Sequence, residues 1–216
     1  MRQRKPDFHL EEQYSNQGLV IGVDEAGRGP WAGPVMAGAV WINPALLSYL
    51  PSEITDSKKL TPSKRKYIHK ALTSLDIAMA VGQANVEEID RLNILNATFL
   101  AMERACISLQ EKMGSGVKTI LVDGNRKPKF KVMSDQINLI PIINGDNISL
   151  SIAAASIISK LTRDLYMSDL HKRQPEYGFN KHKGYGTAFH RLALAEFGPT
   201  PHHRTSFAPI KALKSQ

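Results

Sequence analysis

The chain has 216 residues, of which 42% are hydrophobic and 22% charged, so it can fold as one globular domain with a sizeable core. Its 28 lysine and arginine residues against 20 acidic ones give a net charge of +8, a balance typical of proteins that bind polyanions such as nucleic acid. The single cysteine, Cys106, excludes an intramolecular disulfide and a thiolate zinc cage, and without a signal-peptide-like or membrane-spanning apolar run we expect a cytoplasmic protein that contacts no membrane.

The first half of the chain contains three apolar, β-branched runs that predict strands. The first run, Leu19–Val23, follows a polar leader and stops at Asp24 and Glu25, before a glycine-rich turn. The runs Val35–Ile42 and Ile77–Ala84 predict the second and third strands. The first predicted strand therefore ends in two carboxylates.

Capping residues and the spacing of apolar side chains predict the helices. Thr61 resembles an N-cap, and Pro62 is suited to the first position of the helix that follows. A long amphipathic helix and an alanine- and isoleucine-rich helix are expected in the second half of the chain. The predicted helices cover residues 62–73, 93–110, 149–170 and 187–197.

Two further strands are predicted in the second half of the chain. Lys118–Val122 ends directly at Asp123, and Leu139–Ile143 is followed by Gly145 and Asp146. Strands that alternate with helices predict an α/β fold whose strand ends bring the acids to one edge of the sheet. The predicted parts are a polar leader, a core and a small loop-rich C-terminal extension: 1–18, 19–173 and 174–216.

Asp24, Glu25, Asp123 and Asp146 are candidate metal ligands, because each follows an apolar strand and precedes or adjoins a glycine. Carboxylates brought together repel one another and raise one another's pKa. A hard dication such as Mg²⁺ or Mn²⁺ removes that repulsion, since both ions prefer oxygen ligands. Two such ions form the clamp used in phosphodiester hydrolysis.

Each acid alone has a simpler interpretation. An acid after a strand is commonly a turn residue or a helix N-cap, and Asp123-Gly124 is an ordinary turn sequence. Asp164 competes for a place in the site, but it lies within a predicted helix near Lys160 and Arg163, which favours a local ion pair. Four acids at equivalent strand ends of a basic protein favour the metal site.

The glycine-rich turn after the first strand, Gly27–Gly33, is not typical of a dinucleotide-binding loop. Its third glycine comes one position late for that motif, and Asp24 and Glu25 would repel a pyrophosphate. Arg28, between Gly27 and Gly29, suggests a backbone that approaches a ligand closely. The alternative is a tight turn with a solvated arginine. His202 and His203 near Arg204 lack the spacing of a zinc site.

Six blocks of the sequence, in this order, resemble the signature of the ribonuclease HII family. The resemblance extends from Val20 through Phe207. The blocks are Asp24–Pro30 (DEAGRGP), Asp56–Leu60 (DSKKL), Leu121–Asn125 (LVDGN), Ser151–Ile157 (SIAAASI), Lys160–Asp164 (KLTRD) and His182–Thr187 (HKGYGT).

The resemblance implies a ribonuclease H-like mixed β-sheet flanked by helices, with a helical C-terminal extension. The acidic tetrad of the family falls on Asp24, Glu25, Asp123 and Asp146, its Gly-Arg-Gly element on Gly27, Arg28 and Gly29, and its junction-reading tyrosine on Tyr185. The chain departs from the family's common Lys-Gly-Asp-Ser around the last acid, because it has Asn144 and Asn147. Lysines interpreted as phosphate contacts, against the more common solvated role, are Lys58, Lys59, Lys160 and Lys183.

The activity that the resemblance implies is endonucleolytic cleavage of the RNA strand of RNA/DNA hybrids and nicking 5′ to ribonucleotides embedded in duplex DNA. A metal-activated water would attack in line and leave a 3′-hydroxyl and a 5′-phosphate, with two Mg²⁺ or Mn²⁺ ions as cofactors. The 2′-hydroxyl would mark the RNA and not act as nucleophile. We expect a monomer.

Two other functions are compatible with part of the pattern. A ribonuclease HIII-like enzyme shares the fold and acids, but it is expected to carry a sizeable N-terminal substrate-binding domain, and only 18 residues precede Leu19. A non-catalytic nucleic-acid-binding protein would use the basic charge alone. The four acids argue against it, since negative charge in a nucleic-acid groove weakens binding unless a metal neutralises it.

Overall fold

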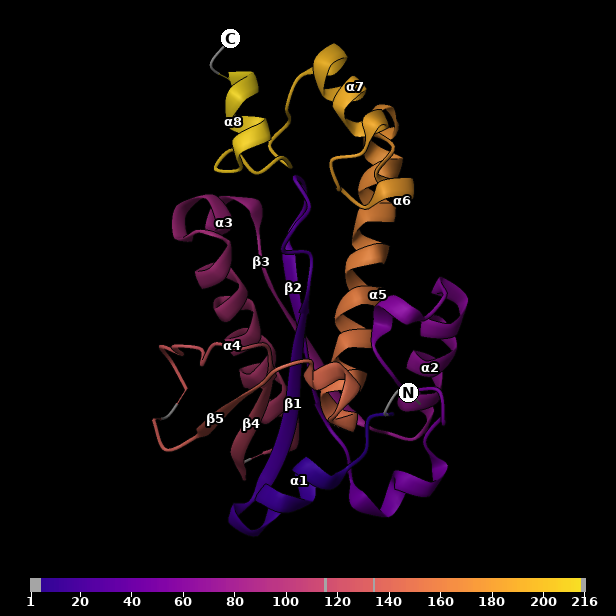
Figure 1. Cartoon of the computed structure of the whole chain (residues 1–216), viewed down its shortest axis with the longest axis vertical. Coiled ribbons are helices and arrows are strands. Elements are labelled where there is room, and N and C mark those ends of the chain that lie inside the picture. Colours follow the sequence, from indigo (N-terminus) through magenta and orange to yellow (C-terminus); the bar gives the residue numbers. More distant parts are fainter. Residues whose placement is uncertain (1–4, 115, 134, 215–216) are drawn as a thin grey trace.

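In a computed structural model, which describes residues 5–114, 116–133 and 135–214, the chain forms a five-stranded mixed sheet flanked by helices (Figure 1). The strand order is β3-β2-β1-β4-β5. β1 pairs antiparallel with β2 and parallel with β4, while β2–β3 is antiparallel and β4–β5 parallel. The strands are β1 Leu19–Ala26, β2 Val35–Trp41, β3 Ala78–Ala84, β4 Val117–Asp123 and β5 Asn138–Ile142.

The strands confirm the predicted mixed sheet, but the first acids lie inside a strand and not after it. Asp24 pairs with Gly38, and Glu25 with Ala37, so β1 continues past the apolar run in its ladder with β2. Asp123 is likewise the last residue of β4. Because successive side chains of a strand point to opposite faces, Asp24 and Glu25 face different sides of the sheet.

The two faces of the sheet are covered by different helices (Figure 1). On one face, α3 (Val86–Leu92) and α4 (Ile94–Met113) pack over a cluster that includes Ile21 and Val23 of β1. On the other face, α5 (Leu150–Arg173) lies against β1 and β2, with α2 (Pro62–Ser74) beside it. The predicted amphipathic helices form, because each buries its apolar side on the sheet.

Glycines allow α5 to approach the sheet closely. A Cβ atom on Gly22 would lie 2.3 Å from the backbone nitrogen of Ile152, and one on Gly38 would lie 2.5 Å from the carbonyl oxygen of Ala155. The small residues of the Ser151–Ile157 block meet these glycines, so the backbone of α5 rests directly on β1 and β2. This packing holds the start of α5 next to the acids of β1.

Short helices complete the molecule. The polar leader contains α1 (His9–Tyr14), and its buried Glu11 accepts hydrogen bonds from Ser149 Oγ at 2.6 Å and Ser151 N at 2.8 Å. Helix α3 ends at Leu92, and the next residue, Asn93, caps α4 by accepting hydrogen bonds from the backbone nitrogens of Leu95 and Asn96. The hydrogen bonds of Glu11 thus fasten the leader to the N-terminus of α5.

The C-terminal region contains α6 (Phe179–His182), the predicted helix α7 (Ala188–Phe197) and α8 (Ala208–Lys214). These helices surround a small apolar cluster with the last turns of α5, and Figure 1 shows α5 running from the sheet into this region. The cluster also includes Ala32 of the glycine-rich turn. The C-terminal region thus packs against the segment that follows β1.

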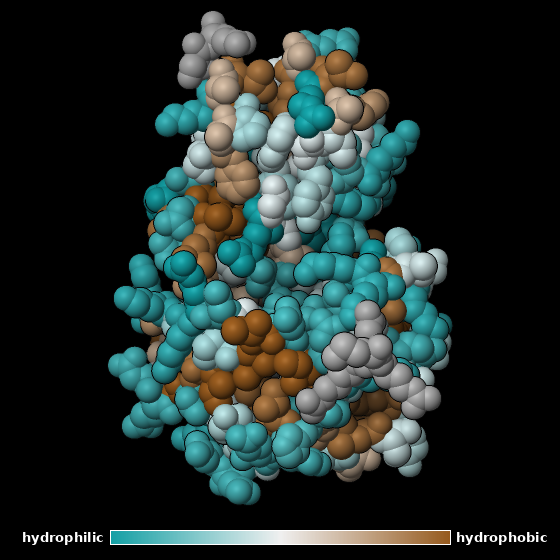
Figure 2. All heavy atoms as spheres, in the orientation of Figure 1, coloured by the Kyte–Doolittle hydropathy of each residue, from teal (hydrophilic) through white to brown (hydrophobic). Residues whose placement is uncertain are grey.

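The surface in Figure 2 is mainly hydrophilic, with an apolar area near the edge strand β5. Ile143, just after β5, is 66% exposed. Within the described ranges of the chain, no helix combines the length and the apolar composition needed to cross a membrane.

Candidate active site

Four acidic side chains come together at one edge of the sheet. Asp24 and Glu25 lie near the end of β1, and Asp123 ends the parallel neighbour β4. The backbone nitrogen of Gly145 donates to Asp123 Oδ1 at 2.7 Å, which fixes the short 3₁₀ turn η4 (Gly145–Asn147) and its Asp146 beside Asp123. The residues predicted as metal ligands are therefore grouped by β1, β4 and the turn after β5.

Burial and mutual repulsion raise the pKa of these carboxyl groups. For Asp24, burial raises the pKa well above its usual range, and the charges of Glu25 and Asp123 add to the effect. Burial also raises the pKa of Glu25, against the opposing charge of Arg28, and it raises the pKa of Asp123. Burial and the charges of neighbouring carboxylates raise the pKa of Asp146 to about 6. A cation would relieve this repulsion.

The donor atoms fit a hard divalent cation, because the cluster offers carboxylate oxygens and neither imidazole nor thiolate. In the structure these oxygens accept hydrogen bonds from the protein. Asp24 Oδ1 accepts from the Glu25 nitrogen at 2.6 Å, and Asp146 Oδ1 from Asn147 Nδ2 at 2.7 Å. Among the described residues, no three acidic, histidine or cysteine side chains already surround a common ion position. Ligation would therefore require side-chain rotations.

A fifth acid, Asp56, was missed in the sequence. It precedes the 3₁₀ turn η3 (Ser57–Lys59) and caps it by accepting a hydrogen bond from the Lys58 nitrogen at 2.9 Å. Its charge and a side-chain hydrogen bond contribute to the raised pKa of Asp146. The DSKKL block contains Asp56, but only its two lysines were predicted as site residues.

Lys58 lies among these acids. Burial lowers its pKa, but the charges of Asp24, Asp56, Asp146 and Asp123 outweigh burial and raise the pKa overall. Its ammonium group therefore remains charged and partly neutralises the cluster. A cation held in this position can also contact a phosphate that enters the site.

A cavity of about 500 Å³ adjoins the acids and brings together most of the predicted substrate contacts. Tyr185 is 48% exposed, and its Cε1 would lie 3.5 Å from a Cβ atom on Gly29. The ring thus stands beside the glycine-rich turn, and it is not among the described side chains of the small apolar cluster in the C-terminal region. Predicted site residues that line the cavity are Glu25, Gly27, Arg28, Gly29, Lys58, Lys160 and Tyr185.

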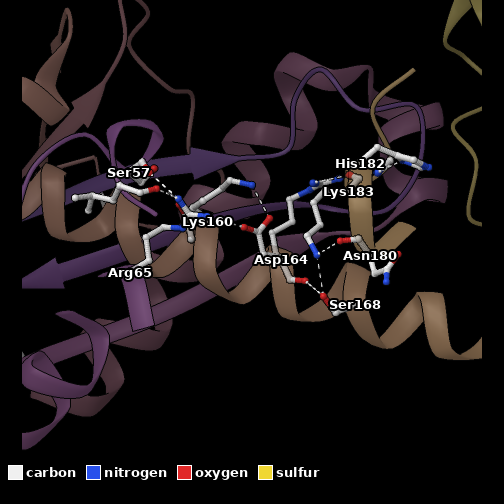
Figure 3. Close-up of polar contacts among 12 residues, drawn as sticks. Ser57, Arg65, Lys160, Asp164, Ser168, Asn180, His182 and Lys183 are labelled. Carbon is white, nitrogen blue, oxygen red and sulfur yellow. Dashed lines mark hydrogen bonds and ion pairs between the residues drawn. The ribbon is translucent and has the colours of Figure 1, made fainter. Parts of the chain in front are cut away.

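Two predicted phosphate contacts lie outside the lining of this cavity. Lys59 Nζ donates to Asn147 Oδ1 at 2.5 Å, next to Asp146. Lys183 Nζ donates to Ser168 Oγ at 2.9 Å and to the carbonyl of Asn180 at 2.8 Å (Figure 3). Lys183 thus ties α6 to α5.

Asp164 is held by cations on two helices, which confirms its predicted ion pair (Figure 3). Its carboxylate pairs with Lys160 Nζ at 2.5 Å and with Arg65 Nη2 at 3.2 Å. Arg65 also donates to the carbonyls of Ser57 and Leu60, at 2.9 and 2.5 Å. Asp164 therefore supports the loop that carries Lys58.

Two serines that sequence reasoning also missed connect this loop to the acids. A 2.8 Å hydrogen bond joins Ser156 Oγ of α5 to Ser57 Oγ, and a hydrogen bond with Ser156 also lowers the pKa of Asp24, against the effect of burial. Both side chains line the cavity. Their place in the DSKKL and SIAAASI blocks was the available signal.

Comparison with known proteins identifies relatives along most of the chain. The sequence model of the family described as ribonuclease HII matches residues 21–210. The ribonuclease HII of Paramagnetospirillum magneticum is 47% identical over 206 residues, which cover 95% of this chain and 96% of the relative. That of Wolbachia pipientis wMel is 47% identical over 205 residues, with the same coverage of both chains.

Solved structures agree with this relationship. Ribonuclease H2 from Pyrococcus horikoshii has a TM-score of 0.71 at 25% identity, over 91% of this chain and 97% of that one. The Bst-RNase HIII structure with Mn²⁺ has a TM-score of 0.75 over 95% of this chain and 72% of that one, and its 17% identity shows the fold alone. The chain belongs to the ribonuclease HII family and is a ribonuclease H endonuclease.

Proposed function

We propose that the enzyme cuts the RNA strand of RNA/DNA hybrids and nicks duplex DNA on the 5′ side of a single embedded ribonucleotide, leaving a 3′-hydroxyl and a 5′-phosphate. One observation carries the proposal. The carboxylates of Asp24, Glu25, Asp123 and Asp146 gather beside a cavity whose wall combines a glycine-rich turn with an exposed tyrosine. The acids suit hydrolysis of a phosphodiester, and the wall suits contact with a sugar.

The four acids would hold Mg²⁺ or Mn²⁺, and we expect two ions during catalysis. When bound, such ions lower the pKa of a water molecule and neutralise charge on the attacked phosphate. The protein contributes the fixed positions: β1 and β4 hold three acids in register, and the Gly145–Asp123 hydrogen bond holds the fourth. Lys58 adds a positive charge where the phosphate would enter.

The glycine-rich turn and Tyr185 would recognise the ribonucleotide. Gly27 and Gly29 carry no side chain that would hold the sugar away from the backbone, so main-chain groups can reach a 2′-hydroxyl. Tyr185 stands next to Gly29 and can stack on the sugar of the following deoxynucleotide. The contacts would sense an RNA-to-DNA junction, and Lys160 would contact a phosphate at the same cavity.

The test is a cleavage assay on two duplexes, one with a single ribonucleotide in DNA and one a long RNA/DNA hybrid. With Mg²⁺ or Mn²⁺ we expect a nick on the 5′ side of the ribonucleotide with 3′-hydroxyl ends, and no cleavage in excess chelator. Asp24→Asn should lower kcat by at least about 1,000-fold, because a ligand charge is lost while shape is kept.

The matched control is Asp169→Asn, an acid on the exposed side of α5 that pairs with Lys172 and Arg173. It should keep parental activity on both duplexes. Cleavage that persists without divalent metal, or an Asp24→Asn enzyme with near-parental kcat, would contradict the proposed site. Cleavage of the hybrid alone would contradict recognition of single ribonucleotides.

A further inference from the structure

Two arginines are buried beneath the glycine-rich turn without an acidic partner. Arg163 of α5 and Arg204 of the C-terminal region are 1% and 0% exposed. In the part of the chain that the structure describes, neither guanidinium forms an ion pair, and all their hydrogen bonds go to backbone carbonyls. Burial lowers the pKa of Arg204 to about 9, so it still carries its charge near neutral pH.

Arg204 holds the carbonyl groups of the predicted substrate turn. Its Nη2 donates to the carbonyl of Gly27 at 2.6 Å, its Nη1 to that of Arg28 at 2.9 Å, and its Nε to that of Gly33 at 2.9 Å. These hydrogen bonds span 177, 176 and 171 residues of the chain. The side chain thus fastens the start of the turn to its end.

The hydrogen bonds from Arg204 to the carbonyls of Gly27 and Arg28 determine where the N–H groups of the turn point. In a planar trans peptide the carbonyl and the N–H point in opposite directions. Because the carbonyls of Gly27 and Arg28 point inward to Arg204, the N–H groups of Arg28 and Gly29 point away from it. Among the described residues neither N–H has a hydrogen-bond acceptor, and both residues line the cavity. Two backbone donors are therefore aimed at the space for the substrate.

His203, the residue before Arg204, holds the backbone of Tyr185 through a chain of hydrogen bonds. The Thr200 nitrogen donates to His203 Nδ1 at 2.9 Å, so the proton of His203 is on Nε2. That nitrogen lies 3.1 Å from His190 Nε2, and His190 Nδ1 lies 3.0 Å from the carbonyl of Tyr185. The only consistent proton arrangement has His203 donating to His190 and His190 donating to Tyr185.

The same segment also joins the two loops directly. The Arg204 nitrogen donates to the carbonyl of Trp31 at 2.8 Å, and the Trp31 nitrogen donates to the carbonyl of Gly184 at 2.8 Å. The turn that starts at Gly27 and the loop that carries Tyr185 are therefore connected to each other and to His203 and Arg204. Their relative position depends on this segment.

We propose that Arg204 is a positioning residue for ribonucleotide recognition: it aims the N–H groups of Arg28 and Gly29 at the 2′-oxygen of the substrate and, with His203, sets their distance from Tyr185. This inference rests on the proposed function, because it assigns the selectivity of the same site. The side-chain hydrogen bonds of Arg204 go to the turn and to none of the four acids, so it acts on binding selectivity and not on the hydrolytic step.

The experiment measures Kd for a duplex with one ribonucleotide and for the same duplex in all-DNA form, in an Asp24→Asn background that prevents cleavage. Arg204→Lys keeps the positive charge but cannot donate all three hydrogen bonds to the carbonyls of the turn in the same geometry. We expect it to reduce the preference for the ribonucleotide about tenfold, with the all-DNA Kd changed less than about threefold. In the cleaving enzyme, Arg204→Lys should raise KM and leave kcat within about threefold.

Two further variants separate positioning from a loss of fold or charge. Lys172→Met removes one cation from the exposed surface of α5, where Lys172 is 77% exposed, and it should keep the full preference. Tyr185→Ala combined with Arg204→Lys should reduce the preference by less than the product of the two single effects, because both act on one contact surface. Effects that multiply would overturn the link to Tyr185.

The outcomes also separate this inference from the proposed function. An Arg204→Lys protein that melts as a folded protein and keeps the parental preference would overturn the inference while leaving the function intact. A parent protein that binds both duplexes equally would instead contradict the proposed ribonucleotide recognition. A defect confined to kcat would assign Arg204 to the hydrolytic step and overturn the positioning role.

Discussion

Asp146 and Asp164 carry the same side chain in opposite electrostatic surroundings. Burial and the charges of Asp56 and Asp123 raise the pKa of Asp146 to about 6. Asp164 instead accepts charged hydrogen bonds from Lys160 and Arg65. A carboxylate among like charges gains most from a divalent cation, whereas one already paired by two cations has little need of it.

Replacing Asp146 or Asp164 by asparagine should therefore give different defects. At saturating Mg²⁺, Asp146→Asn should lower kcat by at least about 100-fold and change Tm little, since a metal ligand is weakened in an unchanged shape. Asp164→Asn should keep kcat within about threefold but lower Tm by about 3–8 °C, because Arg65 loses its buried partner. The measurements are single-ribonucleotide cleavage and thermal melting, and the reverse pattern would make Asp164 the fourth ligand.

At the scale of elements, glycines allow the backbone of α5 to rest directly on β1 and β2, next to the acids of β1. Gly38→Ala would place a methyl group 2.5 Å from the carbonyl oxygen of Ala155, which the α5 backbone cannot easily avoid. Overpacking of this kind costs about 1–3 kcal/mol, so we expect Tm to fall by about 3–10 °C.

Gly114→Ala is the control for this change, because no atom lies within 4 Å of its Cβ position and only its φ of +81° opposes alanine. It should cost about 1 kcal/mol. Equal melting temperatures for Gly38→Ala and the parent would show that α5 shifts without cost and is not held at this distance.

The main elements could be predicted because their apolar residues recur at regular spacing and their ends carry capping residues. Helix α3 (Val86–Leu92) could not, since it is short and charged, and Asn93 alone, at φ +65°, separates it from α4. The grouping of Asp24 with Asp123 follows from parallel strands. Asp56 could not be found in this way, because its place beside Asp146 depends on how a loop packs against α5.

The contact between α7 and the segment before Arg204 depends on neutral histidines. Burial lowers the pKa of His190 and of His203 to about 4, against 6.5 for an exposed histidine. Below pH 6.5 these two histidines bind protons in the unfolded chain but remain neutral in the folded chain. Their titration therefore lowers the free energy of unfolding as pH falls from about 6.5 to about 4. Above pH 6.5 it has no such effect.

We therefore expect the free energy of unfolding in urea, relative to its value at pH 6.5, to be higher at pH 4.5 in His203→Gln than in the parent. The comparison between variant and parent matters because the raised pKa values of the site acids act in the opposite direction, and both proteins share them. Parallel pH profiles would mean that the pair titrates normally in the folded protein.

At the scale of the whole molecule, part of the positive charge lies on the loop that follows Asp123. Arg126, Lys127, Lys129 and Lys131 follow Asp123 on an exposed loop. Glu103 of α4 is 3% exposed. Its carboxylate holds the end of this loop by accepting hydrogen bonds from the backbone nitrogens of residues 131, 132 and 133. The loop thus presents like charges from a fixed backbone, which suits a run of phosphates.

Replacing Lys127 and Lys129 by glutamine should weaken hybrid binding and reduce its salt dependence. The slope of log K against log salt concentration is negative. Each phosphate that a lysine no longer neutralises lowers the magnitude of this slope by about 0.9, so we expect the magnitude to decrease by about 2. Binding titrations between about 50 and 300 mM salt measure it. The control pair, Lys66→Gln and Lys70→Gln on the exposed side of α2, should leave the slope unchanged. Equal slopes for both pairs would place the loop outside the bound duplex.

The bonds from Arg204 to Gly27 and Arg28, which span 177 and 176 residues, can form only after almost all of the intervening chain has been synthesised. Because translation proceeds from the N-terminus, the turn leaves the ribosome long before the guanidinium that holds its carbonyl groups. A nascent chain can pair β1 with β2 long before this, yet its turn stays unfastened. A chain cut short before Arg204 would therefore lack the side chain that holds both ends of this turn.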